Sequence, residues 1–189
     1  PFNTHRFSIQ SLSPNDVEAI VFWSKNPLPL ITFLSAIDRL GFHNRYLFHF
    51  TLNPYNQTVF EPHLPPISER IDTFSRLADT IGPTRIIWRY DPIIFCKGNL
   101  KLDLTFHQQA FFHLIKFLHP FTKKVVVSFL DFYKKNHWFF KTLKKQYNLE
   151  IIEPDLNVID DLTKNITETA NSFGIEVLDA AKKPNIPRL

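Results

Sequence analysis

Cysteine, glycine and methionine are the residues that this sequence has least of. Its single cysteine, Cys96, excludes an internal disulfide and any cysteine-rich metal site within the chain, and a reduced, cytoplasmic setting fits best. With only 4 glycines among 189 residues, no glycine-rich phosphate loop follows any expected strand. Methionine is absent even at position 1, and the chain opens abruptly at Pro1, so we expect a fragment of a longer protein.

Long apolar runs are missing as well. No run approaches the roughly 20 residues that a membrane-crossing helix needs, and the polar opening has none of the features of a signal peptide. We therefore expect no membrane association. The formal net charge of +4 permits a phosphate-bearing partner without requiring one. The length and the 44% of hydrophobic residues suit one globular α/β domain over residues 1–189.

Apolar runs of strand length alternate with amphipathic stretches of helical length. We expect strands at 19–23, 46–52, 84–90, 124–130 and 175–178, and helices near 28–40, 68–80, 105–118, 135–146 and 155–174. No hairpin signal joins neighbouring strands, so the crossovers predict a parallel sheet with helices outside. A complete eight-unit barrel needs roughly 250 residues. The sequence therefore predicts a TIM-barrel-like sheet organised as a partial (βα) barrel, and the missing glycine fingerprint disfavours a Rossmann-type sheet.

Charged residues at the end of the third expected strand are the strongest indication of a site. Alternate residues of a strand share a face, so Ile87, Arg89 and Asp91 are expected to point the same way. Buried charges are costly unless they are paired or bound to something. The carboxyl ends of parallel strands are also where such folds hold their ligands.

Polar side chains also follow the other strands, and they are expected to gather on the same rim. The candidate ligand-binding residues are Lys25, Asn26, Thr51, Asn53, Glu61, Arg70, Arg89, Asp91 and Asp131, with His49 beside them. Alternatives stay open for several of these residues. Arg89 and Asp91 can form a closed ion pair, His49 can be a hydrogen-bonded core histidine, and Asp131 can cap the following helix.

The loop before the second long helix adds a carboxylate and a cation. Glu61 lies in the proline-rich segment 60–66 on the same expected rim, and Arg70 lies in the first turn of the helix. A cation there opposes the helix dipole, which favours an external partner for Arg70. The alternative is a rigid surface loop with a solvated arginine.

The basic, aromatic segment 137–145 has two interpretations. Aromatic rings interleaved with lysines suit stacking on nucleic acid. At helical spacing, however, the same rings make a packing stripe with the lysines on a solvated face, and we favour that interpretation. No metal-ligand spacing and no nucleophile elbow of the Ser-His-Asp type occur in the chain.

Several motifs together resemble a bacterial family known as Domain of Unknown Function 1848. The most specific are Phe-Trp-Ser-Lys-Asn-Pro at 22–27 and Trp-Arg-Tyr-Asp-Pro-Ile-Ile at 88–94. Weaker matches are Phe-Thr-Leu-Asn-Pro-Tyr at 50–55, Glu-Pro at 61–62, Arg-Ile at 70–71, Ile-Gly-Pro at 81–83 and Ser-Phe-Leu-Asp-Phe-Tyr at 128–133. The resemblance covers most of the chain, from Pro1 to about Val177.

The resemblance implies a core like the partial (βα) barrel of radical S-adenosylmethionine enzymes, with S-adenosylmethionine and a 4Fe-4S cluster in full-length members. The layout of Glu61, Pro65 or Pro66, and Arg70 is similar to a motif in radical enzymes related to spore photoproduct lyase. Two of the family's features are missing: an opening strand that would precede Pro1, and a C-terminal cysteine cluster. With Cys96 alone the chain cannot assemble a four-iron cluster, so we expect no cofactor in this chain and truncation at both ends.

Three functional hypotheses follow. In the first, the chain is the core of a radical-S-adenosylmethionine-like protein that binds this cofactor or another anionic small molecule at the strand ends. In the second, it is a non-catalytic nucleotide- or nucleic-acid-binding barrel that lost the cluster. In the third, Glu61 and Asp91 perform acid–base chemistry without a cluster. The sequence does not indicate the reaction, the substrate or the oligomeric state.

Overall fold

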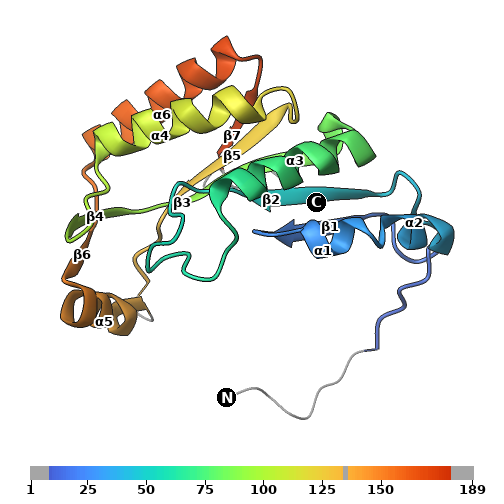
Figure 1. Cartoon of the computed structure of the whole chain (residues 1–189), viewed down its shortest axis with the longest axis horizontal. Coiled ribbons are helices and arrows are strands. Elements are labelled where there is room, and N and C mark those ends of the chain that lie inside the picture. The colour runs from blue at the N-terminus through green and yellow to red at the C-terminus, as the bar shows by residue number, and fades with distance from the viewer. Residues whose placement is uncertain (1–8, 134–135, 180–189) are drawn as a thin grey trace, which may run out of the picture.

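The structure is a computed structural model that describes residues 9–133 and 136–179 (Figure 1). Its centre is a five-stranded parallel sheet. In spatial order the strands are β1 (Ile20–Ser24), β2 (Tyr46–Thr51), β3 (Ile86–Ile93), β5 (Lys124–Phe129) and β7 (Glu176–Asp179). This order follows the order in the chain, so successive right-handed crossovers deliver their helices to the same side of the sheet. The five expected strands are confirmed.

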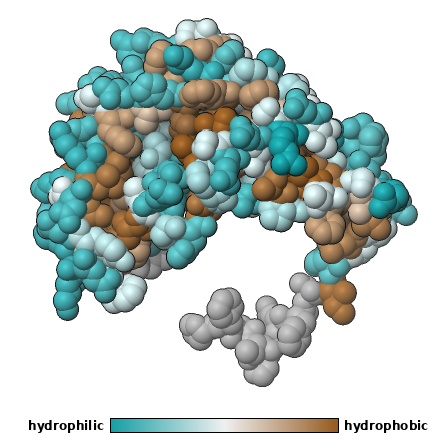
Figure 2. Space-filling model, viewed as in Figure 1, coloured by the Kyte–Doolittle hydropathy of each residue, from teal (hydrophilic) through white to brown (hydrophobic). Residues whose placement is uncertain are grey.

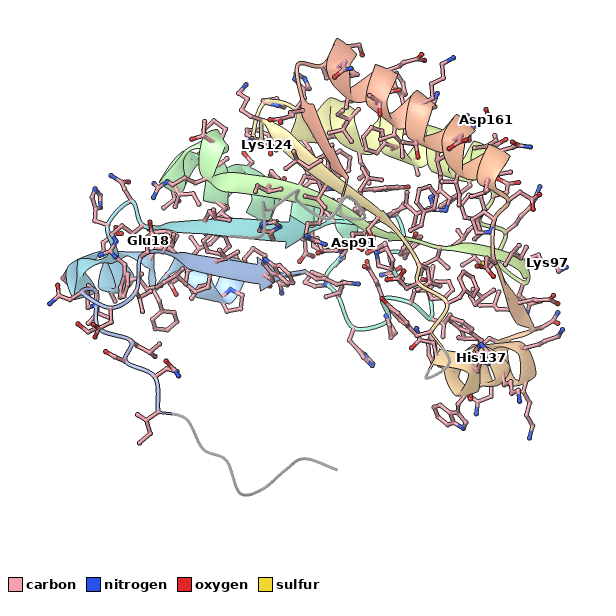
Figure 3. All side chains as sticks on the ribbon, turned by 180° about the vertical axis from the view of Figure 1, so that it is seen from behind. Glu18, Asp91, Lys97, Lys124, His137 and Asp161 are labelled. Carbon is pink, nitrogen blue, oxygen red and sulfur yellow. The ribbon has the colours of Figure 1, made fainter. Side chains whose placement is uncertain are left out.

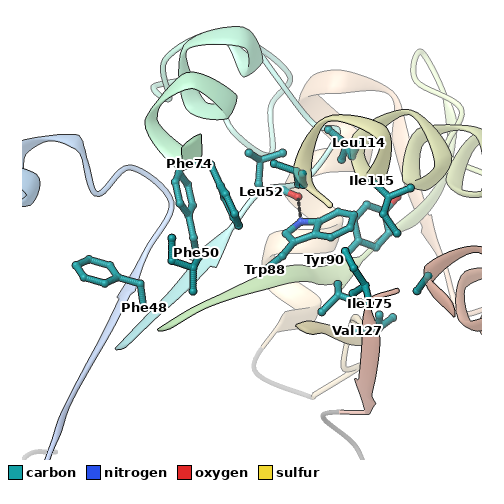
Figure 4. Packing of buried hydrophobic residues seen from close by; sticks show 14 of the residues in the cluster. Phe48, Phe50, Leu52, Phe74, Trp88, Tyr90, Leu114, Ile115, Val127 and Ile175 are labelled. Atoms are coloured by element: carbon teal, nitrogen blue, oxygen red, sulfur yellow. Dashed lines mark hydrogen bonds between the residues drawn. The ribbon is translucent and has the colours of Figure 1, made fainter. Parts of the chain in front are cut away.

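Three long helices cover one face of the sheet. They are α3 (Ile67–Ile81), α4 (Leu104–Leu118) and α6 (Leu156–Ser172), and all three lie along the same side in Figure 1. Between them and the sheet lies the main hydrophobic core (Figure 4). At its centre the Trp88 indole stacks on Phe111, with ring centroids 5.0 Å apart, and donates a 2.9 Å hydrogen bond to the Leu52 carbonyl. Trp88 is therefore a packing residue.

The opposite face of the sheet carries no such layer of long helices. Burial alternates along β2 and β3, where the even-numbered residues are buried and the odd-numbered residues up to Asp91 are half-buried. The space-filling view shows the molecule hollowed on the side away from α3, α4 and α6 (Figure 2). Within the described residues the sheet is open, with β1 and β7 at its two edges, and no closed barrel forms.

The expected helix over 28–40 is broken into three short pieces. They are α1 (Leu28–Ile31), α2 (Leu34–Ile37) and the π-helical turn η1 (Asp38–Phe42). Gly41 inside η1 has a φ of +98°, a conformation that glycine adopts without steric cost and that cannot continue a regular helix. The apolar spacing predicts helical packing over 28–40, but it does not predict where the helix is interrupted.

A second, two-stranded antiparallel sheet was not expected. It pairs β4 (Phe95–Gly98) with β6 (Leu149–Ile152) and packs with α5 (His137–Tyr147) around a small hydrophobic cluster that includes Tyr55, Leu143 and Leu149. The remaining element is the short 3-10 helix η2 (Pro83–Arg85). None of the helices in the described parts of the chain has both the length and the apolar character to cross a bilayer.

Candidate ligand site at the carboxyl ends of the strands

Arg89 and Asp91 lie on the open face of the sheet, as the alternation predicts. The Arg89 guanidinium forms an ion pair with Asp91, with Nε donating to Oδ2 at 3.0 Å. It also lies 5.1 Å from the centroid of the Trp23 ring, a cation–π arrangement with a residue of β1. Asp91 lies near the centre of the molecule (Figure 3). The closed ion pair is thus the observed alternative, and both Nε and Nη2 of Arg89 donate to Asp91 in it.

His49 completes this group on β2. The Arg89 Nη1 donates to His49 Nδ1 at 3.2 Å, and since a guanidinium only donates, Nδ1 accepts and the ring is neutral. Burial, with the Arg89 charge as a second cause, lowers the pKa of His49 below its usual value, in agreement with this assignment. His49 is a neutral acceptor that orients Arg89.

Asn53 lies at the rim, but its amide is used by the backbone. The buried side chain donates to the Asp91 carbonyl at 2.8 Å and accepts from the Asp91 amide at 2.9 Å. These two bonds extend the pairing of β2 and β3 beyond the last residue of β2. Asn53 therefore positions Asp91, and both of its amide atoms are bonded to the backbone of that residue.

Three other predicted site residues make no hydrogen bond to this group within the described structure. Asn26 accepts the Leu28 amide at 3.3 Å and so stabilises the start of α1. Thr51 lies in register with Arg89 on the open face, and its side chain makes no hydrogen bond within the described parts of the chain. Asp131 is exposed beyond the end of β5, and its backbone carbonyl accepts from Asn136 at 3.2 Å. It does not cap α5, whose N-cap residue is Asn136.

A second cluster joins Lys25, Glu61 and Arg70. The Glu61 carboxylate accepts from Lys25 Nζ at 2.8 Å through Oε1, and Oε2 lies 3.1 Å from Arg70 Nη2. The Glu61 and Arg70 side chains are 1% and 0% exposed, whereas the Lys25 side chain is 40% exposed. The segment just beyond β1, the loop over 54–66 and α3 bring these three residues together.

The cluster of Lys25, Glu61 and Arg70 carries a net positive charge. Two cations share one carboxylate, which leaves an excess of one positive charge in a place that is largely shielded from water. The Arg70 Nε and Nη1 atoms have no hydrogen-bond partner in the described structure, although both are buried. An unpartnered buried donor is energetically costly. The arrangement is suited to an acceptor that reaches this guanidinium, such as a carboxylate or phosphate oxygen.

Two buried residues beneath the site were missed by the sequence analysis. The Tyr55 hydroxyl donates to the Pro92 carbonyl and accepts from the Ile94 amide, both at 2.9 Å, and burial raises the pKa of Tyr55. His107 links Tyr90 to the Ile94 carbonyl, with both contacts at 2.9 Å. Both residues hold the chain after Asp91. No local signal could identify them, because their partners lie 13 to 39 residues away.

The residues present do not fit an iron–sulfur cluster. Cys96 is the only cysteine of the chain, its thiol is buried, and Sγ donates to the Leu100 carbonyl at 3.3 Å. Burial also raises the pKa of Cys96, which disfavours the thiolate that a cluster needs. Among the described residues no group of three or more His, Cys, Asp or Glu side chains is arranged to hold a metal ion.

Comparisons with known proteins identify the family. No curated protein and no solved structure gives a significant match to this chain. One family model, described as Domain of unknown function (DUF1848), matches residues 1–188. The match spans nearly the whole chain and includes both of the specific motifs, at 22–27 and at 88–94. This chain therefore belongs to the DUF1848 family.

Proposed function

We propose that this chain is the ligand-binding core of a protein that resembles radical S-adenosylmethionine enzymes. It binds an anionic small molecule at the carboxyl ends of β1, β2 and β3. The strand order supports an incomplete (βα) barrel, because the order in space follows the chain and the long helices all lie on one face. In this arrangement the open face of the sheet corresponds to the interior of a barrel, where the ligand lies above the strand ends.

The observation that carries the proposal is the buried Arg70 guanidinium with two unpartnered nitrogens. Glu61 holds it in place, and Lys25 extends the positive charge from this buried position to solvent. The ligand must accept hydrogen bonds from Arg70 and balance the positive charge. A carboxylate or a phosphate does both, since each offers several acceptor oxygens and a negative charge. The carboxylate of S-adenosylmethionine and the phosphate of a nucleotide are the two ligand groups that fit this chemistry.

Asp91 supplies a complementary acceptor. Its Oδ2 pairs with Arg89, while Oδ1 has no hydrogen-bond partner in the described residues. A fixed carboxylate oxygen of this kind suits ribose hydroxyls, which both S-adenosylmethionine and nucleotides carry. The exposed Trp23 ring beside Arg89 gives the ligand an apolar surface.

Cluster-free acid–base chemistry is less well supported. Glu61 and Asp91 are each held in an ion pair with an arginine, so both carboxylates already have a partner within the protein. A non-catalytic binder is the second candidate, and the single buried Cys96 favours it because this chain alone does not supply cluster ligands. Both leading candidates share the same binding site.

Calorimetric titration with S-adenosylmethionine, adenosine monophosphate and inorganic phosphate tests the proposal. Lys25→Gln is the informative variant, and Lys124→Gln is its control. Lys124 is 45% exposed, pairs with Glu176, and lies at the amino end of β5, away from the site. We expect Lys25→Gln to weaken binding about tenfold or more and Lys124→Gln to leave it unchanged. The absence of binding by all three ligands, or equal losses in both variants, would overturn the proposal.

A further inference from the structure

Helix α5 exposes several aromatic and basic side chains. Trp138 is 75% exposed, Phe139 45% and Tyr147 47%, whereas Leu143 is buried. The expectation that these rings form a packing stripe is therefore wrong for three of them. Only Leu143 reaches the small hydrophobic cluster. Large aromatic side chains so exposed on one short helix need an explanation other than the core.

Positive charge is concentrated on the same segment. Residues 132–149 contain five lysines and no aspartate or glutamate, while the whole chain has a net charge of +4. The rest of the molecule is thus slightly negative. Lys144 pairs with Glu150 at 2.9 Å. Lys141 and Lys145 are exposed and form no ion pair with any described residue, so their charges are available to a partner.

Trp138, Lys141 and Lys145 lie on one face of the helix, since residues three and seven positions apart are neighbours along it. A hollow of about 280 Å³ lies along this face and is lined by all three. A larger cavity of about 590 Å³ adjoins Trp138, between α5 and the loop that carries Pro62. Its wall includes Thr58, Val59 and Phe139.

We propose that this surface, Trp138 with Lys141 and Lys145, binds single-stranded nucleic acid. A base stacks on the exposed Trp138 ring, and the two unpaired lysines contact successive phosphates. Trp138 lies beside the lysines, whereas Phe139, Leu143 and Tyr147 lie on another face of the helix. A helix in a membrane interface needs a free apolar face, but Leu143 of this one is buried in the small hydrophobic cluster, which favours nucleic acid over a lipid surface.

Fluorescence anisotropy with labelled oligo(dT) and oligo(U) tests the proposal on the full chain. We expect Trp138→Ala to weaken binding between about fivefold and a hundredfold, which is the range for the loss of one stacked base. We expect the double variant Lys141→Gln/Lys145→Gln to reduce the slope of log K against log salt by about 1.4. Lys25→Gln is expected to leave oligonucleotide binding unchanged. The experiments can therefore distinguish a failure of this proposal from a failure of the proposed ligand site.

Matched controls come from other helices. Phe117→Ala removes an aromatic side chain of α4 that is 58% exposed, and Lys164→Gln removes an exposed lysine of α6 that has no ion pair in the described structure. Both are expected to bind like the unsubstituted chain. Circular dichroism checks that each variant is folded. The proposal is overturned if no oligonucleotide binds, if the controls lose as much affinity as the test variants, or if only anionic lipid vesicles bind.

Discussion

The Glu61 carboxylate and the Arg70 guanidinium face each other at 3.1 Å, and both side chains are shielded from solvent. Glu61 comes from the loop after β2, and Arg70 comes from the first turn of α3. Lys25, just beyond β1, contacts the same carboxylate. The pair therefore fixes a loop between two elements of the fold, and it also concentrates positive charge at the candidate site.

Replacing Glu61 by glutamine is expected to destabilise the fold. The amide keeps the shape of the side chain but leaves the buried Arg70 charge without its anion, which costs about 3–5 kcal/mol. Urea denaturation measures the loss. Glu150→Gln is the matched control, because Glu150 also contacts two lysines but is 43% exposed. There the same substitution is expected to change stability far less, because an exposed ion pair is screened by solvent. Similar losses in the two variants would contradict the role assigned to the buried pair.

Asn53→Ala is expected to cost about 2–4 kcal/mol. It leaves the Asp91 amide and carbonyl without the two hydrogen bonds of the Asn53 side chain in a buried place. Asn26→Ala removes a single 3.3 Å hydrogen bond at a half-buried position and is expected to cost less than about 1 kcal/mol. Thermal and urea unfolding compare the two. If Asn26 proves the more costly replacement, the account of Asn53 is wrong.

The sequence predicted the parts of the fold that depend on local pattern. The five strands of the main sheet follow from apolar, β-branched runs. The common face of Arg89 and Asp91 follows from the two-residue period of a strand. The resemblance also identified the family. These features need no knowledge of distant contacts.

The parts that were missed depend on contacts between distant segments. β4 and β6 are separated by more than 50 residues, so no hairpin signal announces their pairing. Asn53 was predicted to bind a ligand, but its use by the Asp91 backbone depends on the exact register of β2 and β3. The exposure of Trp138 likewise depends on which segments pack against α5. The spacing of aromatic residues along a helix does not show whether the rings are buried or exposed.

Gly98→Ala is expected to disrupt the β4–β6 pair. Gly98 has a φ of +115°, and an added Cβ would lie 1.9 Å from the Asn148 carbonyl oxygen, so the backbone must move. Gly174 also has a positive φ, +69°, but an added Cβ there meets no atom within 4 Å. We expect about 1 kcal/mol for Gly174→Ala from backbone strain alone and clearly more for Gly98→Ala. Urea unfolding ranks the two variants. Equal costs would show that the close approach at Gly98 is relieved without loss.

The His107 side chain is expected to make stability depend on pH. Its Nε2 faces the Ile94 carbonyl and therefore carries the proton, while Nδ1 accepts from the Tyr90 hydroxyl, so the ring is neutral. Burial lowers the pKa of His107 to about 4, from 6.5 in the unfolded chain. The unfolded state therefore binds the proton first as the pH falls.

The stabilisation linked to His107 is complete above pH 6.5 and is lost as the pH falls towards 4. The total amounts to about 3 kcal/mol. His107→Gln can keep both hydrogen bonds without titrating, so urea unfolding between pH 7.5 and 4 should give a shallower pH dependence for this variant. The exposed His113 of the same helix provides the control, and His113→Gln should follow the unsubstituted chain. Parallel pH profiles for all three proteins would show that His107 binds its proton equally well in the folded and unfolded states, which would contradict the assigned role of burial.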